Sequence, residues 1–485
     1  MNRRLRIAFV AALLLTAGTV AFRWSVGRKE PDEEAFIPQN EVITPEIRLL
    51  QRYTRIDTSN PPGNETAGAR FLIAELRKGG MNAELIESAP GRGNVYARIK
   101  GRTSGEGLML LHHIDVVPAD AKQWTVPPFA GRTLRNELYG RGVLDMKGIG
   151  ICHLLAFLEV ARRHQRPERD IVFLAVADEE VSSRFGMEWL LANRPDVFAG
   201  VRYALNEGGI TETIKGAITY FGIETGSKQI VKFVLRASTR EKLLAARIAL
   251  EPLFVPDEPD RVLPEVRRFF RAIAPHRLES GALLKDIDAT IAAGKFWLVP
   301  QGMRELTYNN AWLLGVDRDD RGPKMEGTLL NLPDEEPDAR IADLEKRVAP
   351  FGLTIEILDK TGPSPISSDE TPFFRFLTSE IRRQYGNVDV GPDILALSRT
   401  DCRYLRHRGV QCYGLWPFPV DVYETGGIHG RDERVRLDWF GSGATLERQI
   451  VLRHAFSRGP SQPVQGTGGS RRSVTALGGG LRPVR

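Results

Sequence analysis

The chain has few of the residues that staple small extracellular domains or build thiolate metal sites. Its 485 residues include only three cysteines, Cys152, Cys402 and Cys412, without the close spacings of a thiolate zinc site or a disulfide framework. Stability must therefore come from packing. A Cys402–Cys412 bridge stays open for an oxidising compartment, but the pattern favours small buried apolar residues at these positions.

The body of the chain also lacks a basic surface, although the formal net charge is +6. Residues 1–29 hold six basic and no acidic side chains, and residues 458–485 hold five basic and no acidic side chains. Of the 67 basic residues, 56 remain in the body against 61 acidic ones. Because a nucleic-acid-binding face needs clustered Lys and Arg, we expect no nucleic-acid partner.

One long apolar run occurs, at residues 7–22, directly after Arg3, Arg4 and Arg6. A charged start followed by a short hydrophobic region is typical of a secretory signal or a signal anchor. We therefore expect an exported protein that is periplasmic, extracellular or anchored to the membrane by this segment. The run is slightly short for a membrane span, and the cleavage signal at residues 19–21 is imperfect, so cleaved and anchored forms both stay open.

Apolar runs and helical patterns alternate along most of the body, which predicts an α/β fold. Residues 108–111, 171–176, 201–205 and 410–415 read as buried strands, and residues 148–163 read as a helix between the first two. A different sequence pattern follows, in which amphipathic helices at 241–253 and 337–348 alternate with short strands. This pattern predicts an inserted smaller domain. We predict a signal segment 1–28, a linker 29–43, a catalytic domain 44–228, an inserted lid domain 229–358, a second catalytic part 359–457 and a disordered tail 458–485.

Acidic and imidazole groups follow successive predicted strands, where ligands gather in α/β sheets. These groups are His113 and Asp115, Glu179 and Glu180, and Glu207, together with Asp145 in a Gly-rich turn and His429 near the end of the body. Histidine and carboxylate ligands without thiolates fit a hydrolytic zinc site, and two metals would need one shared carboxylate. The alternative is a structural role for scattered acidic residues. His153 lies inside an apolar helical pattern and is expected to be a core histidine.

Several motifs resemble the zinc metallopeptidases that include glutamate carboxypeptidase, aminoacylase, acetylornithine deacetylase and carboxypeptidase S. The signature lies in residues 113–118, continues through Trp124, 127–129 and 139–142, and ends at 145–148. Residues 56–63 near the start and 429–434 near the end are also similar to family segments. Residues 206–209, Asn-Glu-Gly-Gly, lean toward the carboxypeptidase S branch.

The resemblance implies a mixed-sheet catalytic domain with an inserted ferredoxin-like lid, and hydrolysis of a peptide or N-acyl amide bond. It implies two Zn²⁺ ions, although Co²⁺ or Mn²⁺ would accept the same ligands. One ion would be held by His113 and Glu207, the other by Glu180 and His429, with Asp145 bridging both. Asp115 would hydrogen-bond the His113 imidazole and fix its tautomer, and Glu179 would be the general base. A cis peptide is implied after Asp145.

The predicted lid departs from the family pattern in two places. The family's Gly-His-Ser type loop, whose His stabilises the oxyanion, is missing, because residues 234–238 pass directly into a helix beginning near Thr239. An Arg expected before a Leu-Pro is also missing, since the chain reads Asn331 before Leu332-Pro333. His276 is a weak candidate replacement, because its surroundings read equally well as a solvated loop.

Two functions follow from these observations. The first is a two-zinc hydrolase acting on a small peptide or an N-acyl amino acid, with a homodimer through the lid as a further expectation. The second is a non-catalytic or weakly active metal-binding relative with a binding or regulatory role. Loss of one oxyanion donor costs roughly 10²–10³ in rate elsewhere, so a complete metal centre is compatible with either.

Overall fold

The computed structural model describes residues 42–457 apart from 210, 215–216, 255, 257 and 421–426. The predicted signal segment, most of the predicted linker and the predicted tail lie outside these residues. Within the described ranges, no helix is both long and apolar enough to cross a membrane.

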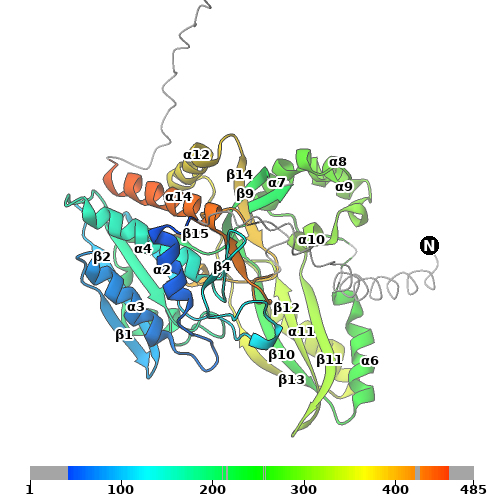
Figure 1. The fold of residues 1–485 in the computed structure, drawn as a ribbon. Helices are drawn as coiled ribbons and strands as arrows, with labels where there is room; N and C mark the ends of the chain where they lie inside the picture. Colours follow the sequence, from blue (N-terminus) through cyan, green and yellow to red (C-terminus); the bar gives the residue numbers. More distant parts are fainter. Residues whose placement is uncertain are drawn as a thin grey trace, which may run out of the picture. The chain divides into compact units, whose positions relative to one another are not determined.

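One large mixed sheet forms the frame of the described chain (Figure 1). Its main path runs β1-β2-β6-β3-β7-β15-β9-β14, and β8 pairs with β9. The strands β3, β6, β7 and β15 are parallel, whereas β2 and β9 run antiparallel to their neighbours β6 and β15. The strands are β1 (Glu84–Ala89), β2 (Arg92–Ile99), β3 (Gly107–His113), β6 (Ile171–Val176), β7 (Val201–Asn206), β8 (Thr211–Ile214), β9 (Ala217–Ser227), β14 (Asp389–Leu395) and β15 (Gln411–Gly414).

Helices cover both faces of this sheet, because successive side chains of a strand point to opposite faces. In β3, Leu108 and Leu110 join one core cluster, while Met109 and Leu111 join another. The first core is covered by α2 (Pro45–Thr54), α3 (Glu65–Lys78), α4 (Lys147–Arg162), α12 (Pro372–Tyr385) and α14 (Leu437–Phe456). The second is covered by α5 (Met187–Asn193) and α13 (Cys402–Arg406).

The apolar runs predicted the central strands well, because strands buried on both faces need continuous apolar sequence. The run 171–176 coincides with β6, and the runs at 108–111, 201–205 and 410–415 fall within one or two residues of β3, β7 and β15. The helix predicted at 148–163 is α4, and His153 within it is buried, 1% exposed, as expected of a core histidine. The mixed α/β fold class is therefore confirmed.

A second, four-stranded sheet is formed by the segment predicted as the lid and the two residues after it, with the order β11-β12-β10-β13. Two helices, α6 and α11, pack their apolar side chains onto it around Phe233 and Met325. Its elements are β10 (Gln229–Arg236), α6 (Arg240–Leu250), β11 (Asn310–Asp319), β12 (Gly322–Asn331), α11 (Pro337–Val348) and β13 (Thr354–Lys360). Residues Ile43–Arg485 group as one unit by their contacts, so the boundaries of a separate lid domain stay a prediction.

A helical segment between α6 and β11 was not foreseen as a distinct feature. It contains α7 (Pro264–Ile273), α8 (Gly281–Lys285), α9 (Ile287–Ala292) and α10 (Gln301–Arg304). Phe269 and Phe270 of α7 pack in a core cluster with Tyr220 of β9 and Ile394 of β14. Helix α7 of the insertion therefore packs against the large sheet.

The expectation of free, buried cysteines at 402 and 412 is wrong. Cys402 of α13 and Cys412 of β15 form a disulfide, with their Cα atoms 5.4 Å apart. Only residues 407–410 separate α13 from β15, and the turn there brings the two cysteines together, which their separation of ten residues did not reveal. Cys152 is a free, buried thiol.

Two short antiparallel strands, β4 (Arg132–Leu134) and β5 (Glu137–Tyr139), pair with each other, and β5 also pairs with β16 (Arg434–Arg436), which gives a three-stranded sheet. This sheet joins the segment before Asp145 to the segment after His429.

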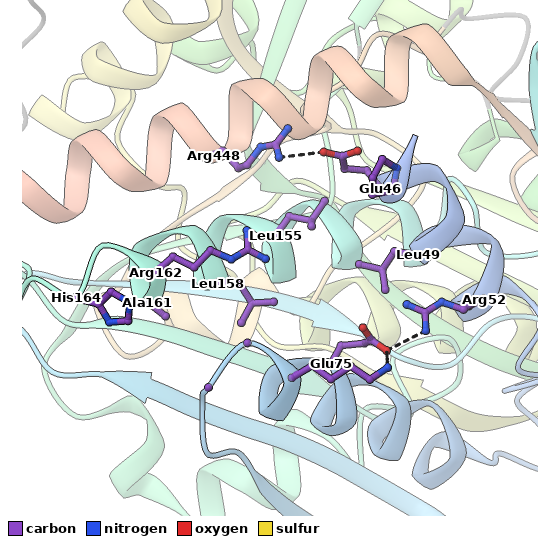
Figure 2. A pocket seen from close by; sticks show the side chains of 14 residues that line it. Glu46, Leu49, Arg52, Glu75, Leu155, Leu158, Ala161, Arg162, His164 and Arg448 are labelled. Carbon is purple, nitrogen blue, oxygen red and sulfur yellow. Dashed lines mark hydrogen bonds and ion pairs between the residues drawn. The ribbon is translucent and has the colours of Figure 1, made fainter. Parts of the chain in front are cut away.

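Elsewhere, α2, α3, α4 and α14 line a groove of about 640 Å³ (Figure 2). Its floor includes Leu49 and Leu158, its rim carries the ion pairs Arg448–Glu46 and Arg52–Glu75, and it contains none of the predicted site residues.

Candidate metal centre

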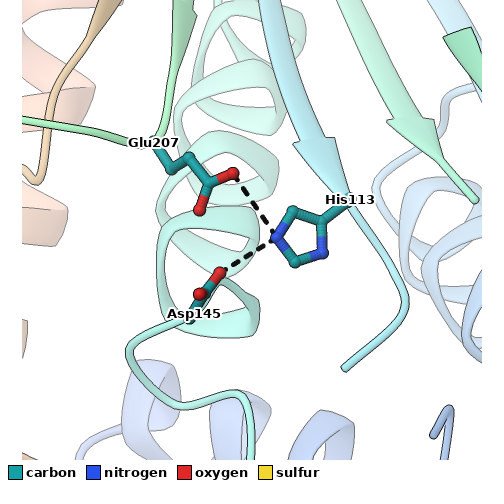
Figure 3. Close-up of side chains that lie close together, drawn as sticks. All are labelled: His113, Asp145 and Glu207. Carbon is teal, nitrogen blue, oxygen red and sulfur yellow. Dashed lines mark hydrogen bonds and ion pairs between the residues drawn. The ribbon is translucent and has the colours of Figure 1, made fainter. Parts of the chain in front are cut away.

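Three predicted ligands from separate elements meet at the carboxyl ends of β3 and β7 (Figure 3). His113 is the last residue of β3, Glu207 directly follows β7, and Asp145 lies just before α4. The His113 Nε2 atom is 3.0 Å from Asp145 Oδ1 and 3.6 Å from Glu207 Oε1. The parallel arrangement of β3 and β7 explains this meeting, because both strands end at the same edge of the sheet.

A second group of three shares Asp145 with the first. His429 Nε2 lies 3.0 Å from Asp145 Oδ2 and 3.0 Å from Glu180 Oε2. Glu180 follows β6 by four residues, and its side chain is 4% exposed, whereas that of His429 is 52% exposed. Asp145 therefore faces one imidazole with each carboxylate oxygen, and the other four side chains predicted to bind metal come together around it.

The ionisable side chains in this cluster shift one another's pKa values. Burial lowers the pKa of His113, but Glu207, Asp115 and Asp145 outweigh that effect and raise it well above its usual range. Hydrogen bonds to Asp145 and Glu180 raise the pKa of His429 to about 11. Burial and the charge of Asp145 raise the pKa of Glu207 well above its usual range. Without a metal, protons on the two imidazoles supply the positive charge that the carboxylates require.

The His113 ring is held by a backbone group. Its Nδ1 atom lies 2.9 Å from the backbone carbonyl of Asp115, and the Asp115 carboxylate is further away, at 3.6 Å. Since a carbonyl oxygen only accepts, Nδ1 carries the hydrogen and Nε2 of the neutral ring is left free to bind a metal. The tautomer is thus the one expected, but the group that fixes it is the main chain of Asp115.

The Asp115 carboxylate instead holds the turn that carries the acidic pair. It is fully buried and accepts hydrogen bonds from the backbone N–H groups of Glu179 and Glu180, at 3.2 and 3.1 Å. The Asn60 side-chain amide donates to it at 2.9 Å and also donates to Asp178 at 2.9 Å. The sequence alone indicated no role for Asn60, although this residue lies in the family-like segment 56–63.

The loop that carries Asp145 is held by a residue whose role the sequence did not reveal. The fully buried carboxylate of Glu433 accepts from the backbone N–H groups of Gly142, Leu144 and Asp145, at 2.8 to 3.1 Å. Arg141 donates to the same carboxylate at 2.8 Å and to the Gly430 carbonyl at 2.8 Å. These bonds tie the loop of Asp145 to the loop of His429. The Asp145–Met146 peptide is cis, as the resemblance implied.

The predicted general base, Glu179, faces the same region from the turn after β6. Burial, reinforced by the charge of Asp401, raises the pKa of Glu179 to about 8. Its Oε1 atom lies 3.9 Å from Nη1 of Arg403, a residue of α13 that sequence reasoning did not single out. The only sequence signal for Arg403 was its place in a largely polar segment, residues 398–403, before the predicted strand at 410–415.

The donor set fits divalent metal ions. Imidazole nitrogens and carboxylate oxygens converge without a thiolate, and one carboxylate faces both halves of the cluster, as a bridging ligand would. The Glu180 Oε1 atom is buried and has no hydrogen-bond partner among the described residues, which is costly unless a cation is bound. Chemically, such a cluster can hold two ions and place a carboxylate, Glu179, beside them.

His276, the weak candidate for the missing lid histidine, lies elsewhere. Its Nε2 atom is 3.1 Å from Asp389 at the start of β14, and its side chain is 32% exposed. In the lid sheet, β10 ends at Arg236 and α6 begins at Arg240, with the Thr239 side chain capping the helix. Sequence and structure therefore agree that the chain has no long loop at this position.

Comparison with known proteins places these features in a family. Residues 109–453 match the sequence profile of Peptidase family M20/M25/M40. Aminoacylase-1 of Sus scrofa is 34% identical over 430 residues, which cover 84% of this chain and 94% of the relative. The N-fatty-acyl-amino acid synthase/hydrolase PM20D1 of Mus musculus is 25% identical over 478 residues, with 89% and 92% covered.

Solved structures agree in fold. The M20 family metallo-carboxypeptidase Sso-CP2 from Sulfolobus solfataricus superimposes with a TM-score of 0.67 at 17% identity, covering 85% of this chain and 99% of that chain. Human carnosine dipeptidase 1 superimposes with a TM-score of 0.63 at 15% identity, with 84% and 96% covered. The resemblance inferred from the motifs is thus confirmed, and the chain belongs to Peptidase family M20/M25/M40.

Proposed function

We propose that this protein is a two-zinc hydrolase that cleaves the amide bond of an N-acyl amino acid or a short peptide. The observation that carries the proposal is the position of Asp145, whose two oxygens each lie 3.0 Å from a different histidine. His113 and Glu207 would hold one ion, Glu180 and His429 the other, and Asp145 would bridge them. The aminoacylases among the relatives favour N-acyl amino acids as the substrate class.

When bound, the two ions would polarise the scissile carbonyl and lower the pKa of the attacking water to about 7. Glu179 would accept a proton from that water and deliver it to the leaving nitrogen. Asp115 holds the turn that carries Glu179, and Asn60 in turn holds the Asp115 carboxylate. Asp115 would also fix the ring of His113 through its backbone carbonyl.

Replacement of Glu179 tests this mechanism. The Glu179→Gln variant should keep two zinc ions per chain and lose hydrolysis by a factor of about 10²–10⁴. Glu345→Gln, at an exposed position on α11, is a matched control that should keep full activity. The substrates are N-acetyl and N-fatty-acyl amino acids and a set of dipeptides. Undiminished hydrolysis by the Glu179→Gln variant would rule out this residue as the base.

The second candidate function is a metal-binding relative with little or no catalysis. It is favoured by the direct passage from β10 to α6, which leaves out the loop that carries the family's oxyanion-binding histidine. Metal analysis combined with the same substrate set separates the two functions. Two bound zinc ions without turnover on any substrate would favour a binding or regulatory role. Absence of bound zinc would contradict both.

We further propose export through residues 1–28 and a homodimer formed through the lid. The lid exposes Ile248 of α6 and Trp312 and Leu314 of β11, which are 71%, 49% and 63% exposed. A second copy of the chain would bury these side chains. Analytical ultracentrifugation should show a dimer for the wild type and a monomer for the Ile248→Asp variant. The N-terminal sequence of the protein recovered from the cell envelope would show whether residues 1–28 are removed.

A further inference from the structure

The short helix α13 presents a buried arginine to the predicted general base. Arg403 is 5% exposed, and its Nη1 atom lies 3.9 Å from Glu179 Oε1. Nη1 also donates to the Thr400 carbonyl at 3.2 Å. Nη2 donates to the Tyr404 hydroxyl at 3.0 Å and, at 3.4 Å, to Ser183 Oγ. These contacts fix the guanidinium while leaving its charge directed at Glu179.

Glu179 and the adjacent Glu180 have different cationic partners among the described residues. Within the described part of the chain, Glu179 is the only carboxylate within ion-pair distance of Arg403, and Arg403 is the only cationic side chain within that distance of Glu179. Glu180, by contrast, contacts His429. Because long side chains move freely unless they are packed or bonded, the orientation of the Glu179 carboxylate requires a fixed partner.

The helix that carries Arg403 is attached to the fold on both sides of that residue. Cys402 forms the disulfide with Cys412 of β15. Arg406, one turn later, forms a buried ion pair with Glu224 of β9 at 2.6 Å. Before the helix, the buried Asp401 accepts a hydrogen bond from Ser183 Oγ at 2.8 Å, and Ser183 belongs to the turn after Glu179. The arginine and the base are therefore parts of one rigid assembly.

We propose that Arg403 is a positioning residue that holds the Glu179 carboxylate toward the metal cluster, and that the Cys402–Cys412 disulfide fixes the helix carrying it. This inference rests on the proposed hydrolase function, in which Glu179 transfers the proton. It assigns to α13 a role in the rate of the reaction and none in metal binding. At 3.9 Å the guanidinium can orient the carboxylate through its charge and leave the carboxylate oxygens free to accept a proton.

Kinetics of the zinc-loaded enzyme test the positioning role. With N-acetyl-L-methionine as the probe substrate, Arg403→Met should lower kcat by about 10- to 100-fold, part of the full effect of a general base, with KM within about twofold. Arg403→Lys should recover part of the rate because it restores the charge but not the planar fork. The zinc content of both variants should equal that of the wild type. A raised KM with unchanged kcat would show direct substrate binding and overturn the proposal.

A matched control is available near the same helix. Arg408 is exposed and donates to the Leu191 carbonyl at 3.1 Å, away from Glu179. Arg408→Met should leave kcat and KM unchanged. A kcat loss equal to that of Arg403→Met would indicate a general effect of removing an arginine from this region and would overturn the assignment.

Thermal unfolding of the metal-free chain provides a readout that does not depend on activity. If the two side chains interact, Arg403→Met should lower Tm less in a Glu179→Gln background than in the wild type, by about 1–2 °C. Additive Tm changes would show that the residues do not interact and would overturn the proposal. If the zinc-loaded wild type hydrolyses none of the N-acyl amino acids or dipeptides, the proposed function fails, and this thermal comparison still decides whether Arg403 holds Glu179.

The contribution of the disulfide is tested by the Cys402→Ala/Cys412→Ala variant. It should lower kcat in the same direction as Arg403→Met, with unchanged zinc content, and add no further loss of kcat in the Arg403→Met background. Full kcat in the disulfide-free variant would show that Arg406 and Asp401 alone fix the helix, and would overturn that part of the proposal.

Discussion

Replacement of Glu433 by Gln should weaken both the fold and the metal centre. The carboxylate accepts four hydrogen bonds, from Arg141 and from the backbone N–H groups of Gly142, Leu144 and Asp145. Burial raises its pKa, whereas the surrounding donors oppose that rise and favour the charged form. In Gln, an NH₂ group replaces one of the two oxygens. This group is itself a donor, so it cannot accept the hydrogen bonds that the surrounding N–H groups donate to Glu433.

The magnitude follows from what the substitution leaves behind. Arg141 is 2% exposed, and its ion pair with Glu433 is fully buried. Removing one partner of a buried pair costs about 3–5 kcal/mol, because the other charge stays uncompensated. That is a large fraction of the roughly 5–15 kcal/mol that stabilises a typical domain. The loop of Asp145 also loses its support, and loss of such support typically lowers metal affinity by about 10- to 100-fold.

Two measurements check this expectation. Urea unfolding of the metal-free chain gives the change in stability, and competition with a chelator gives the zinc affinity. Glu137→Gln is the matched control: Glu137 pairs with Arg434 at 3.1 Å, and both side chains are partly exposed, so the cost should be about 0–1 kcal/mol. If Glu433→Gln unfolds and binds zinc like this control, the supporting role of Glu433 is refuted.

Three further predictions concern pH, metal and packing. Burial raises the pKa of Glu447 to about 8, so the folded chain retains a proton that the unfolded chain releases. The contribution of Glu447 to stability should therefore fall by on the order of 4 kcal/mol from pH 5 to 8.5. Urea titrations of the wild type and the Glu447→Gln variant should show this contribution as the difference between their pH profiles. Zinc affinity should rise with pH, by about tenfold per pH unit for each proton that zinc displaces, because the pKa of His429 in the metal-free chain is about 11. Chelator competition at pH 6, 7 and 8 would measure this rise. Gly186→Ala should destabilise the chain by about 1–3 kcal/mol in urea unfolding, because the new Cβ would lie 2.0 Å from the Ala177 carbonyl oxygen and shift the turn that carries Glu179.

The ligands at strand ends could be predicted because the ends of buried strands can be recognised in a sequence. His113, Glu180 and Glu207 follow apolar runs that became β3, β6 and β7, and parallel strands bring their carboxyl ends to one edge. His429 and Asp145 follow no such strand. Their place was inferred from the family-like segments, because local sequence does not reveal which loops meet.

The supporting residues were not predictable in the same way. Glu433 was part of a recognised segment, but its four donors come from residues about 290 positions earlier. Arg403 reaches Glu179 across more than 200 residues, through a helix of only five residues. Such contacts have no periodicity and no local motif, so composition and spacing carry no signal for them.

The sequence by itself determined the mixed α/β fold class, the central strands, the family and the set of residues that gather around Asp145. Each of these depends on local patterns: apolar runs, turn residues and short motifs. The tertiary structure alone decided that the main chain of Asp115, and not its carboxylate, holds His113, that Cys402 and Cys412 are bonded, and that the helical insertion packs on β9 and β14. These features depend on distances of a few ångströms between segments far apart in the chain, and only the folded backbone sets such distances.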